Sequence, residues 1–328
     1  HHVSSQLGRP VKHQSPTSAA GEEAAVPRRR EGSRRRSTAV QSALLALGVA
    51  CLIVADASRG IVSADTLTDA DLDLACEGSN PYLVTACYPV DLGRNTGMLT
   101  HLPSVLVLRD TPNDRPQYSL AREYQVGSIW GLAYDHTTGD VYGAAFHKRA
   151  SQFGPGGPGA VYRVNVLSRT VEVAFVVPNA GPDHHDFDDP IWDRTAINWA
   201  GKTSLGDLEF DAEGASIFVV NLFDRHIYRI SIDDGDVLQR FSHGAADEPW
   251  ADDARPFALA LNDGWLYHGL VRTGETGSDS DQLEAVVYRS RLSGLEMQLV
   301  AAVPLQYDRG ATRSGSLRWH AWRDGLPA

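Results

Sequence analysis

The chain has 328 residues, with 30 Lys and Arg against 41 Asp and Glu, which gives a formal net charge of −11. Hydrophobic residues make up 42 % of the sequence, a proportion that is typical of folded proteins and too high for a wholly disordered chain. Three cysteines are too few for a disulfide scaffold. The acidic balance argues against nucleic acid as a partner, because phosphate contacts need clustered Lys and Arg.

The first 64 residues have the organisation of an export signal. Residues 1–37 lack apolar periodicity and contain two arginine triplets, which predicts a disordered basic tail. An apolar run over 39–55 follows, so residues 38–64 are predicted to be a signal peptide cleaved after Ala64, or else an uncleaved membrane anchor. Both alternatives place the body, residues 65–328, outside the cytoplasm, secreted or at the cell surface. Only the N-terminal segment is expected to touch a membrane.

The body retains an even number of cysteines. Cys51 lies in the apolar run and would leave with the signal, so Cys76 and Cys87 remain. In an oxidising compartment the two can close a small disulfide loop, stabilising the fold by about 2–3 kcal/mol. The alternative is two reduced thiols in a cytosolic protein; the leader favours the disulfide.

One pattern occurs three times in the body. Each copy begins with an alternating apolar strand, a turn containing Asp or Asn and Gly, and a second alternating strand, which is typical of a β-hairpin. A strand with a Tyr-Arg pair and a fourth β-rich strand follow each hairpin. The hairpins cover 131–142, 206–220 and 257–267, and the later strands cover 160–164 and 170–177, 226–230 and 237–241, and 286–290 and 297–303. Four strands per repeat predict an all-β fold, a β-propeller with four-stranded blades. A β-sandwich is the alternative.

Long insertions separate the predicted strands. They cover 147–159, 179–204, 243–255 and 273–282, and are expected on the propeller faces, where loops on a rigid scaffold carry recognition. Strand material is also predicted at 104–108, 123–125 and 317–322. The blades then form either a four-bladed ring or an incomplete ring in a fragment of a larger propeller. An unclosed ring leaves sheet faces and edges that aggregate or recruit a partner.

Four stretches of the body, 127–149, 153–163, 206–230 and 254–270, resemble exported bacterial β-propeller proteins of the SdrD-B-like, cell-surface type. The resemblance covers roughly residues 80–328 and is most specific in the AFHKR, GPGGPG and NLFDR segments. It implies a seven-bladed surface protein with a longer C-terminal part. It implies no activity for named residues, so whether the protein is an enzyme stays open.

The densest polar cluster lies in the insertion 179–204. Its candidate metal ligands are Asp183, His185, Asp186, Asp188 and Asp189. Carboxylates and imidazoles this close can bind calcium through oxygen or a transition metal through nitrogen, and the acidic composition places calcium ahead of zinc. The spacing matches neither an EF-hand loop nor HExxH, so a solvated acidic loop is the alternative.

A second candidate site is the rim of the central channel. The innermost strand of each blade directs its leading residues there, which predicts a binding site for a metal or small anion at Ser128, Trp130, Asp207, Glu209 and Arg255. In the structural alternative these side chains bond to each other or to backbone amides between blades.

The sequence therefore predicts an exported or cell-surface scaffold that binds a protein or glycan and needs no established cofactor. One alternative is a calcium-dependent hydrolase of the lactonase type with Asp207 and Glu209 as ligands. Another is a carbohydrate-binding module in which Trp192 and Trp250 stack on sugar rings.

Overall fold

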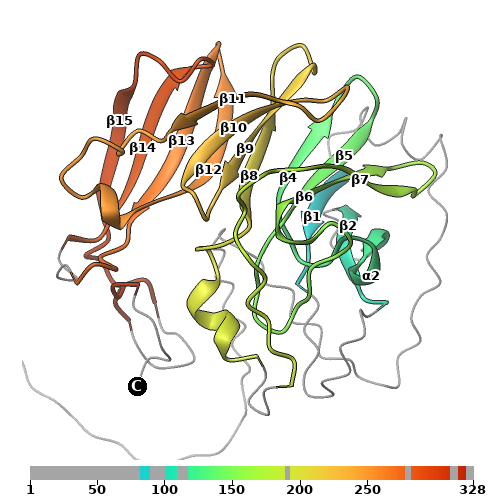
Figure 1. Ribbon diagram of the computed structural model, residues 1–328, viewed down its shortest axis with the longest axis horizontal. Coiled ribbons are helices and arrows are strands. Elements are labelled where there is room, and N and C mark those ends of the chain that lie inside the picture. The colour runs from blue at the N-terminus through green and yellow to red at the C-terminus, as the bar shows by residue number, and fades with distance from the viewer. Residues whose placement is uncertain are drawn as a thin grey trace, which may run out of the picture. The chain divides into compact units, whose positions relative to one another are not determined.

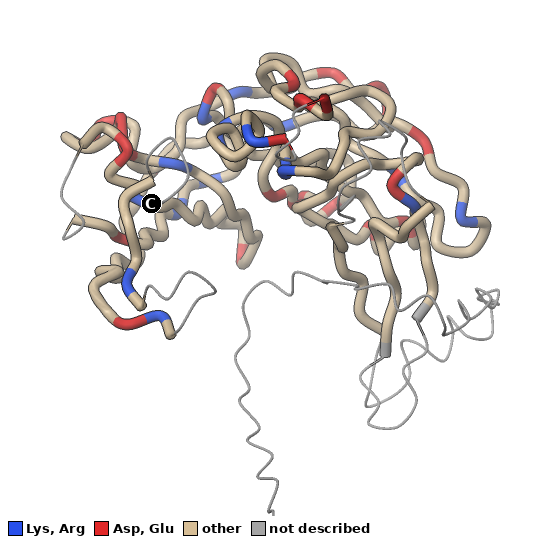
Figure 2. The backbone as a smooth tube through the Cα atoms, turned by 90° about the horizontal axis from the view of Figure 1, so that it is seen from below, with Lys and Arg blue, Asp and Glu red and all other residues tan. Residues whose placement is uncertain are grey.

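A computed structural model of the chain describes residues 82–88, 101–109, 117–188, 193–277, 282–310 and 317–322. The predicted tail (1–37), the predicted signal or anchor (38–64), Cys76, Asp189 and Trp192 lie outside these residues. All described residues belong to one compact unit, 48–328. No helix in this part of the chain is long and apolar enough to span a membrane. Acidic and basic positions are interspersed along the described backbone (Figure 2).

Four antiparallel sheets follow one another along the chain (Figure 1). The first contains β1 (Tyr82–Ala86), β2 (Pro103–Arg109) and β3 (Gln117–Arg122). The second contains β4 (Ile129–Asp135), β5 (Asp140–Ala145), β6 (Ala160–Asn165) and β7 (Val171–Val176). The third contains β8 (Leu205–Phe210), β9 (Ser216–Asn221), β10 (His226–Ser231) and β11 (Val237–Ser242). The fourth contains β12 (Ala254–Asn262), β13 (Trp265–Arg272), β14 (Glu284–Arg291) and β15 (Gln298–Pro304). Short 3₁₀ turns lie at Gly157–Gly159, Thr195–Trp199 and Ala251–Asp253.

The three repeats predicted from the sequence are the three four-stranded sheets, so the all-β fold with propeller blades is confirmed. Turn chemistry explains the hairpins: Asp135 Oδ1 accepts hydrogen bonds from the backbone N–H (2.8 Å) and the hydroxyl (2.6 Å) of Thr137, and Gly139 then adopts a φ of 77°. In the second repeat Asp211 and Gly214, with a φ of 72°, occupy the same places. The described strands do not show a closed ring.

Two predicted strands are wrong. Residues 123–125 belong to a helical turn, α2 (Glu123–Val126), in which the Gln125 side chain accepts a hydrogen bond from the backbone N–H of Arg122. The turn ends at Gly127, which has a φ of 64° and lies so close to Gly154 that a Cβ would clash with its backbone. Residues 317–322 form no strand.

The hydrophobic core lies between consecutive sheets. Side chains of the first sheet pack on the second around Val107 and Tyr162, and those of the second on the third around Tyr142 and Leu208. The third packs on the fourth around Phe218 and Leu266. Burying each such side chain contributes about 1.5–3 kcal/mol, so packing between sheets is the main stabilising term.

The long insertions leave one end of the sheets. Each follows the second or fourth strand of an antiparallel sheet, and those two strands run in the same direction. Figure 1 shows the connection between β7 and β8, which contains the turn Thr195–Trp199, below the sheets. Insertions from different blades can therefore meet at this end.

Candidate metal centre

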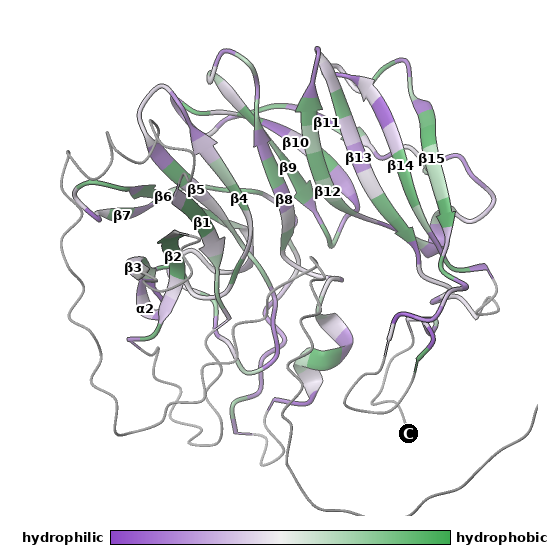
Figure 3. Cartoon of the chain, turned by 180° about the vertical axis from the view of Figure 1, so that it is seen from behind, coloured by the Kyte–Doolittle hydropathy of each residue, from purple (hydrophilic) through white to green (hydrophobic). Residues whose placement is uncertain are grey.

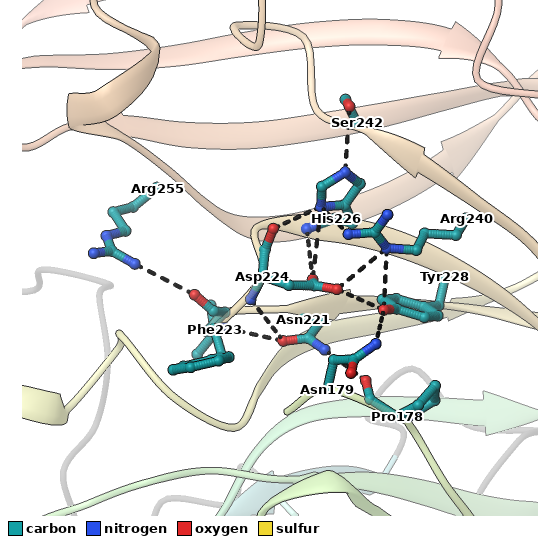
Figure 4. A network of polar contacts seen from close by, with 11 residues as sticks. Pro178, Asn179, Asn221, Phe223, Asp224, His226, Tyr228, Arg240, Ser242 and Arg255 are labelled. Atoms are coloured by element: carbon teal, nitrogen blue, oxygen red, sulfur yellow. Dashed lines mark hydrogen bonds and ion pairs between the residues drawn. The ribbon is translucent and has the colours of Figure 1, made fainter. Parts of the chain in front are cut away.

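The connection from Val177 to Ser204 is fixed to the third sheet at its start (Figure 4). Asn221 Nδ2 donates a hydrogen bond to the carbonyl of Pro178 (3.0 Å), and Asn179 Nδ2 donates one to Tyr228 Oη (3.4 Å). Tyr228 in turn donates to Asp224 Oδ2 (2.5 Å). Asn221 and Asp224 of this network belong to the NLFDR segment, and the network holds the loop where it leaves β7.

The far end of the same connection is fixed by two buried hydroxyl groups. Thr203 Oγ1 lies 3.0 Å from the carbonyl of Ala180 and 3.1 Å from that of Pro182, so its hydroxyl can donate to both. Ser204 Oγ donates to the carbonyl of Ala145 (2.9 Å) and accepts from the backbone N–H of His147 (2.9 Å). These bonds place the loop directly beside His147, the second residue after the end of β5.

Three potential metal ligands converge at this junction. His147 follows β5, and Asp183 and His185 come from the clamped loop; one ligand atom of each lies within 4.8 Å of the others. The side chains of His147 and His185 are 0 % and 1 % exposed, whereas that of Asp183 is 51 % exposed. The two imidazoles stack with centroids 4.3 Å apart, and His147 Nε2 lies 4.0 Å from Asp183 Oδ1. The cluster therefore has a buried nitrogen side and a solvent-accessible oxygen side.

Asp193 orients His185. Its buried carboxylate accepts a hydrogen bond from His185 Nδ1 (2.6 Å) and others from the backbone N–H groups of Ala150 (2.9 Å) and Asp186 (2.8 Å). Burial alone would raise the pKa of Asp193, but these hydrogen bonds together hold it below its ordinary value. An ionised Asp193 accepts the hydrogen bond from Nδ1 of His185 and leaves Nε2 as the ring atom available to a metal ion. Histidines that bind metals usually have such a carboxylate hydrogen-bonded to the ring nitrogen that does not bind the ion.

His147 is held neutral. Burial, and then the neighbouring imidazoles of His185 and His184, lower its pKa to about 3. Its Nε2 accepts a hydrogen bond from the backbone N–H of His184 (3.3 Å), which assigns the proton to Nδ1, so an ion bound at Nε2 would replace this hydrogen bond. Neutral imidazole is the form that binds metals.

Several nitrogen atoms of the cluster are buried without a hydrogen-bond partner among the described residues. They are His147 Nδ1, His184 Nε2 and His185 Nε2. A buried polar atom with no partner costs about 1–3 kcal/mol, so three around one junction need an explanation. Nε2 of His185 is the atom that Asp193 leaves free to bind an ion. His184 instead stacks on Trp199, with ring centroids 3.7 Å apart.

The donor set suits a transition metal better than calcium. Two imidazole nitrogens and one carboxylate oxygen are ligands that zinc takes at about 2.0–2.2 Å, whereas calcium takes six to eight oxygens. Three protein ligands would leave a fourth position open to water or another ligand. The expected order, with calcium ahead of zinc, therefore has no support in the donor set.

The other predicted ligands lie around this cluster. Asp186 donates its backbone N–H to Asp193, and its own carboxylate accepts from the backbone of Asp188 (3.2 Å), which shapes a turn. Asp188 is exposed. Sequence reasoning missed His147 as a ligand, because it is distant in the chain from the acidic loop. The available signal was its position just after a buried strand, at the sheet end from which the loop also leaves.

The carboxylates predicted at the channel rim bond to backbone. Asp207 on β8 accepts from the N–H of Leu208 (3.0 Å) and from that of Leu259 on β12 (3.0 Å), so it links two sheets. Burial raises the pKa of Asp207; burial and then the charge of Asp207 raise that of Glu209, which also accepts from the backbone of Leu261. These contacts are those of the structural alternative.

The remaining rim residues make other contacts. Arg255 pairs with Glu275 (2.8 Å), and Ser128 is buried. Trp130 is 40 % exposed and lies against Phe257, with ring centroids 5.0 Å apart.

Two further predictions concern cysteine and tryptophan. Cys87 is buried, and its predicted disulfide with Cys76 stays a prediction, since Cys76 lies outside the described residues. Trp250 is half-buried, with the Arg272 guanidinium 5.6 Å from its ring centroid, a cation–π contact that occupies one face.

Comparison with known proteins gives distant relatives. No protein-family model matches the chain. It is distantly homologous to colossins of Dictyostelium discoideum: 31 % identical to Colossin-D over 219 residues, which cover 63 % of this chain and 22 % of that protein. It is 27 % identical to Colossin-C over 198 residues, covering 58 % of this chain and 20 % of the relative. The chain thus spans about a fifth of the length of these relatives.

Solved structures resemble this chain only distantly. A chain of the nidogen/laminin complex matches at 13 % identity with a TM-score of 0.39, over 62 % of this chain and 60 % of that one. The calcium-binding protein regucalcin from Agrobacterium tumefaciens matches at 10 % identity with a TM-score of 0.31, over 54 % and 43 %. These likenesses concern the fold alone. The fold is that of β-propeller blades. The comparisons contain no evidence for the SdrD-B-like family.

Proposed function

We propose that this protein is an exported or cell-surface β-propeller scaffold that binds a zinc-like divalent transition metal through His147, His185 and Asp183. One observation carries the proposal. Two buried imidazoles and a carboxylate meet at one junction, and a buried carboxylate, Asp193, bonds to Nδ1 of His185 and leaves Nε2 as the ring atom available to an ion.

Export is proposed from the leader-like composition of residues 38–64, and a protein or glycan partner from the recurrent insertions. The metal centre lies between two of those insertions, 147–159 and 179–204. A bound ion would cross-link them and order a loop surface for a partner. Metal binding and scaffolding are in this way one function.

A second candidate function is metal-dependent hydrolysis. Three protein ligands leave a coordination position in which a metal lowers the pKa of bound water and activates it. The half-exposed Asp183 marks the side from which a substrate would approach. This activity would require the same residues, so it is tested only after binding is established.

The test is a titration of the full chain with Zn²⁺ in competition with a chromophoric chelator, after removal of metal by dialysis. We expect one tight site. His185→Ala should weaken it by more than the roughly 10–100-fold that loss of an outer partner costs. Asp183→Asn changes a half-exposed side chain and tests the same site without disturbing the core.

His136→Ala, in the exposed turn after β4, is the matched control. Its zinc affinity should equal that of the unmodified chain. A chain that binds no zinc in stoichiometric amount, or that binds it unchanged after His185→Ala and Asp183→Asn, contradicts the proposal. Tight binding of Ca²⁺ instead would restore the calcium interpretation.

A further inference from the structure

Aromatic side chains from different sheets meet at the end of the sheets from which the insertions leave. The strands β4, β8 and β12, each the first of its sheet, lie next to one another (Figure 3). Trp130, near the start of β4, meets Phe257, near the start of β12, with ring centroids 5.0 Å apart. On β8, Gly206 lies at this level, and a Cβ there would lie 2.8 Å from the carbonyl oxygen of Phe257. Because Gly206 has no side chain, the two rings can meet across β8.

Two further rings hold Trp130 in place. Tyr88, which follows β1, lies nearly parallel to Trp130 (21°), with ring centroids 6.5 Å apart. Phe146 is buried, and its centroid lies 5.5 Å from that of Trp130 and 5.9 Å from that of Phe257. Trp130 itself stays exposed over 40 % of its surface. An indole that its neighbours hold in place, and that solvent still reaches, is preorganised to stack on a ring of a ligand.

The aromatic cluster continues from Phe257 to Trp322. Gly201 has a φ of 76°, and a Cβ on it would clash with the ring of Trp322 and touch that of Phe257. The backbone N–H of Trp322 donates a hydrogen bond to the carbonyl of Thr273 (2.8 Å), which fixes the tryptophan beside the fourth sheet. We call the four rings that follow one another in this way the aromatic track: Tyr88, Trp130, Phe257 and Trp322.

A lysine lies at each end of the aromatic track. The sequence has three lysines among its 30 basic residues, and the structure describes two of them, Lys148 and Lys202. Lys148 Nζ lies 4.9 Å from the ring centroid of Tyr88, and Lys202 Nζ lies 6.0 Å from that of Trp322. Both described lysines of this arginine-rich chain therefore border the same row of rings.

Neither lysine has a carboxylate to itself. Lys148 is half-buried and forms no ion pair within the described part of the chain. Lys202 lies 3.6 Å from Glu275, but this carboxylate pairs more closely with Arg255 (2.8 Å) and Arg225 (3.0 Å). An anionic group of a ligand would therefore gain a charge-assisted hydrogen bond at either end of the track.

We propose that the aromatic track binds a short acidic oligosaccharide, with a sugar ring stacked on Trp130 and carboxylates paired with Lys148 and Lys202. Neighbouring rings of the track are 5.0 and 6.5 Å apart, comparable with successive rings of a sugar chain. Single-stranded nucleic acid also combines rings with negative charge, but it has a phosphate at every nucleotide, whereas the track has two lysines on a protein of net charge −11. This proposal specifies the glycan partner and rests on that part of the proposed function, independently of the metal centre.

The test is isothermal titration calorimetry of the full chain at about 0.15 M salt, where a screening length of about 8 Å limits long-range repulsion of the ligand. The probes are trisaccharides of galacturonate, mannuronate and glucuronate, together with their methyl esters. We expect at least one acid form to bind with a dissociation constant of about 1 mM or lower. Its ester keeps the rings and loses the charge, so it should bind at least about tenfold more weakly. Trp130→Ala should also weaken binding by at least about tenfold, and Lys148→Met and Lys202→Met by at least about threefold each.

Tyr134→Ala, which removes an exposed aromatic ring of β4 outside the track, is the matched control and should bind the sugar as the unmodified chain does. Circular dichroism verifies that each variant is folded. Trp130→Ala should retain its affinity for zinc, so that loss of sugar binding and failure of the metal centre are separate results. The proposal is overturned if no acid form binds, if acid and ester bind equally, if Trp130→Ala binds unchanged, or if an oligothymidylate binds more tightly than every sugar.

Discussion

Burial of His268 should make the free energy of unfolding depend on pH below neutrality. The side chain lies in the interface between the third and fourth sheets, 1 % exposed, with Nε2 3.0 Å from Ser290 Oγ. Burial, and then the nearby imidazole of His243, lower its pKa from 6.5 to about 4. In the unfolded chain His268 is therefore protonated near pH 6.5, whereas in the folded chain it is protonated only near pH 4.

Proton linkage determines whether this difference in pKa stabilises or destabilises the fold as the pH falls. The unfolded state binds more protons than the folded state between pH 6.5 and 4, so the stability present above pH 6.5 is lost as the pH falls through this window. Between pH 8 and pH 5 the difference amounts to about 1.5 pK units, or about 2 kcal/mol at 1.36 kcal/mol per unit. His268→Gln removes this proton and should reduce the loss of unfolding free energy between those two pH values by about 2 kcal/mol.

The assay is urea denaturation of the metal-free chain at pH 8 and pH 5, followed by tryptophan fluorescence. Ser290→Ala is the control, because it removes the hydrogen bond and keeps the imidazole. It should lower stability by about 1 kcal/mol at both pH values and leave their difference unchanged. If His268→Gln shows the same loss between the two pH values as the unmodified chain, the reasoning from burial is wrong.

Three further outcomes are expected. Asp193→Asn should weaken zinc binding about 10–100-fold in the chelator competition, because His185 loses its orienting carboxylate, whereas Asp188→Asn, in the exposed turn, should not. Asp207→Ala should leave metal content by elemental analysis unchanged and lower the melting temperature, since Asp207 links β8 to β12; loss of metal would restore the channel-rim site. Tyr142→Ala should cost about 3–5 kcal/mol in urea denaturation, as other large core truncations do, while Tyr134→Ala, which is 57 % exposed, should cost little; equal losses would contradict the packing between sheets.

The sheets could be predicted from sequence because their signals are local. Asp135 and Gly139 specify one hairpin turn by side-chain bonding and positive φ, and the alternating strands on each side need no distant information. The helical turn Glu123–Val126 was not predicted, because four residues give no periodicity from which to recognise a helix. Its end depends on the close approach of Gly127 to Gly154, which is a tertiary contact.

The candidate site was predictable only in part. Asp183 and His185 were found because acidic residues and histidines cluster in one loop. His147 and Asp193 take their roles from contacts between separate segments, through Ser204 and through Ala150, that no local pattern encodes. Trp130, Asp207 and Arg255 lie on the first strands of their sheets as predicted, and Ser128 lies just before β4. Strand position could not indicate that Arg255 pairs with Glu275.

X-ray absorption at the zinc edge of the chain loaded with one equivalent of Zn²⁺ tests the metal centre most directly. We expect two imidazole nitrogens and one carboxylate oxygen at about 2.0–2.2 Å, with one imidazole lost from the spectrum of His185→Ala. A first shell made of oxygen alone, or a spectrum that His185→Ala leaves unchanged, would contradict binding through His147, His185 and Asp183.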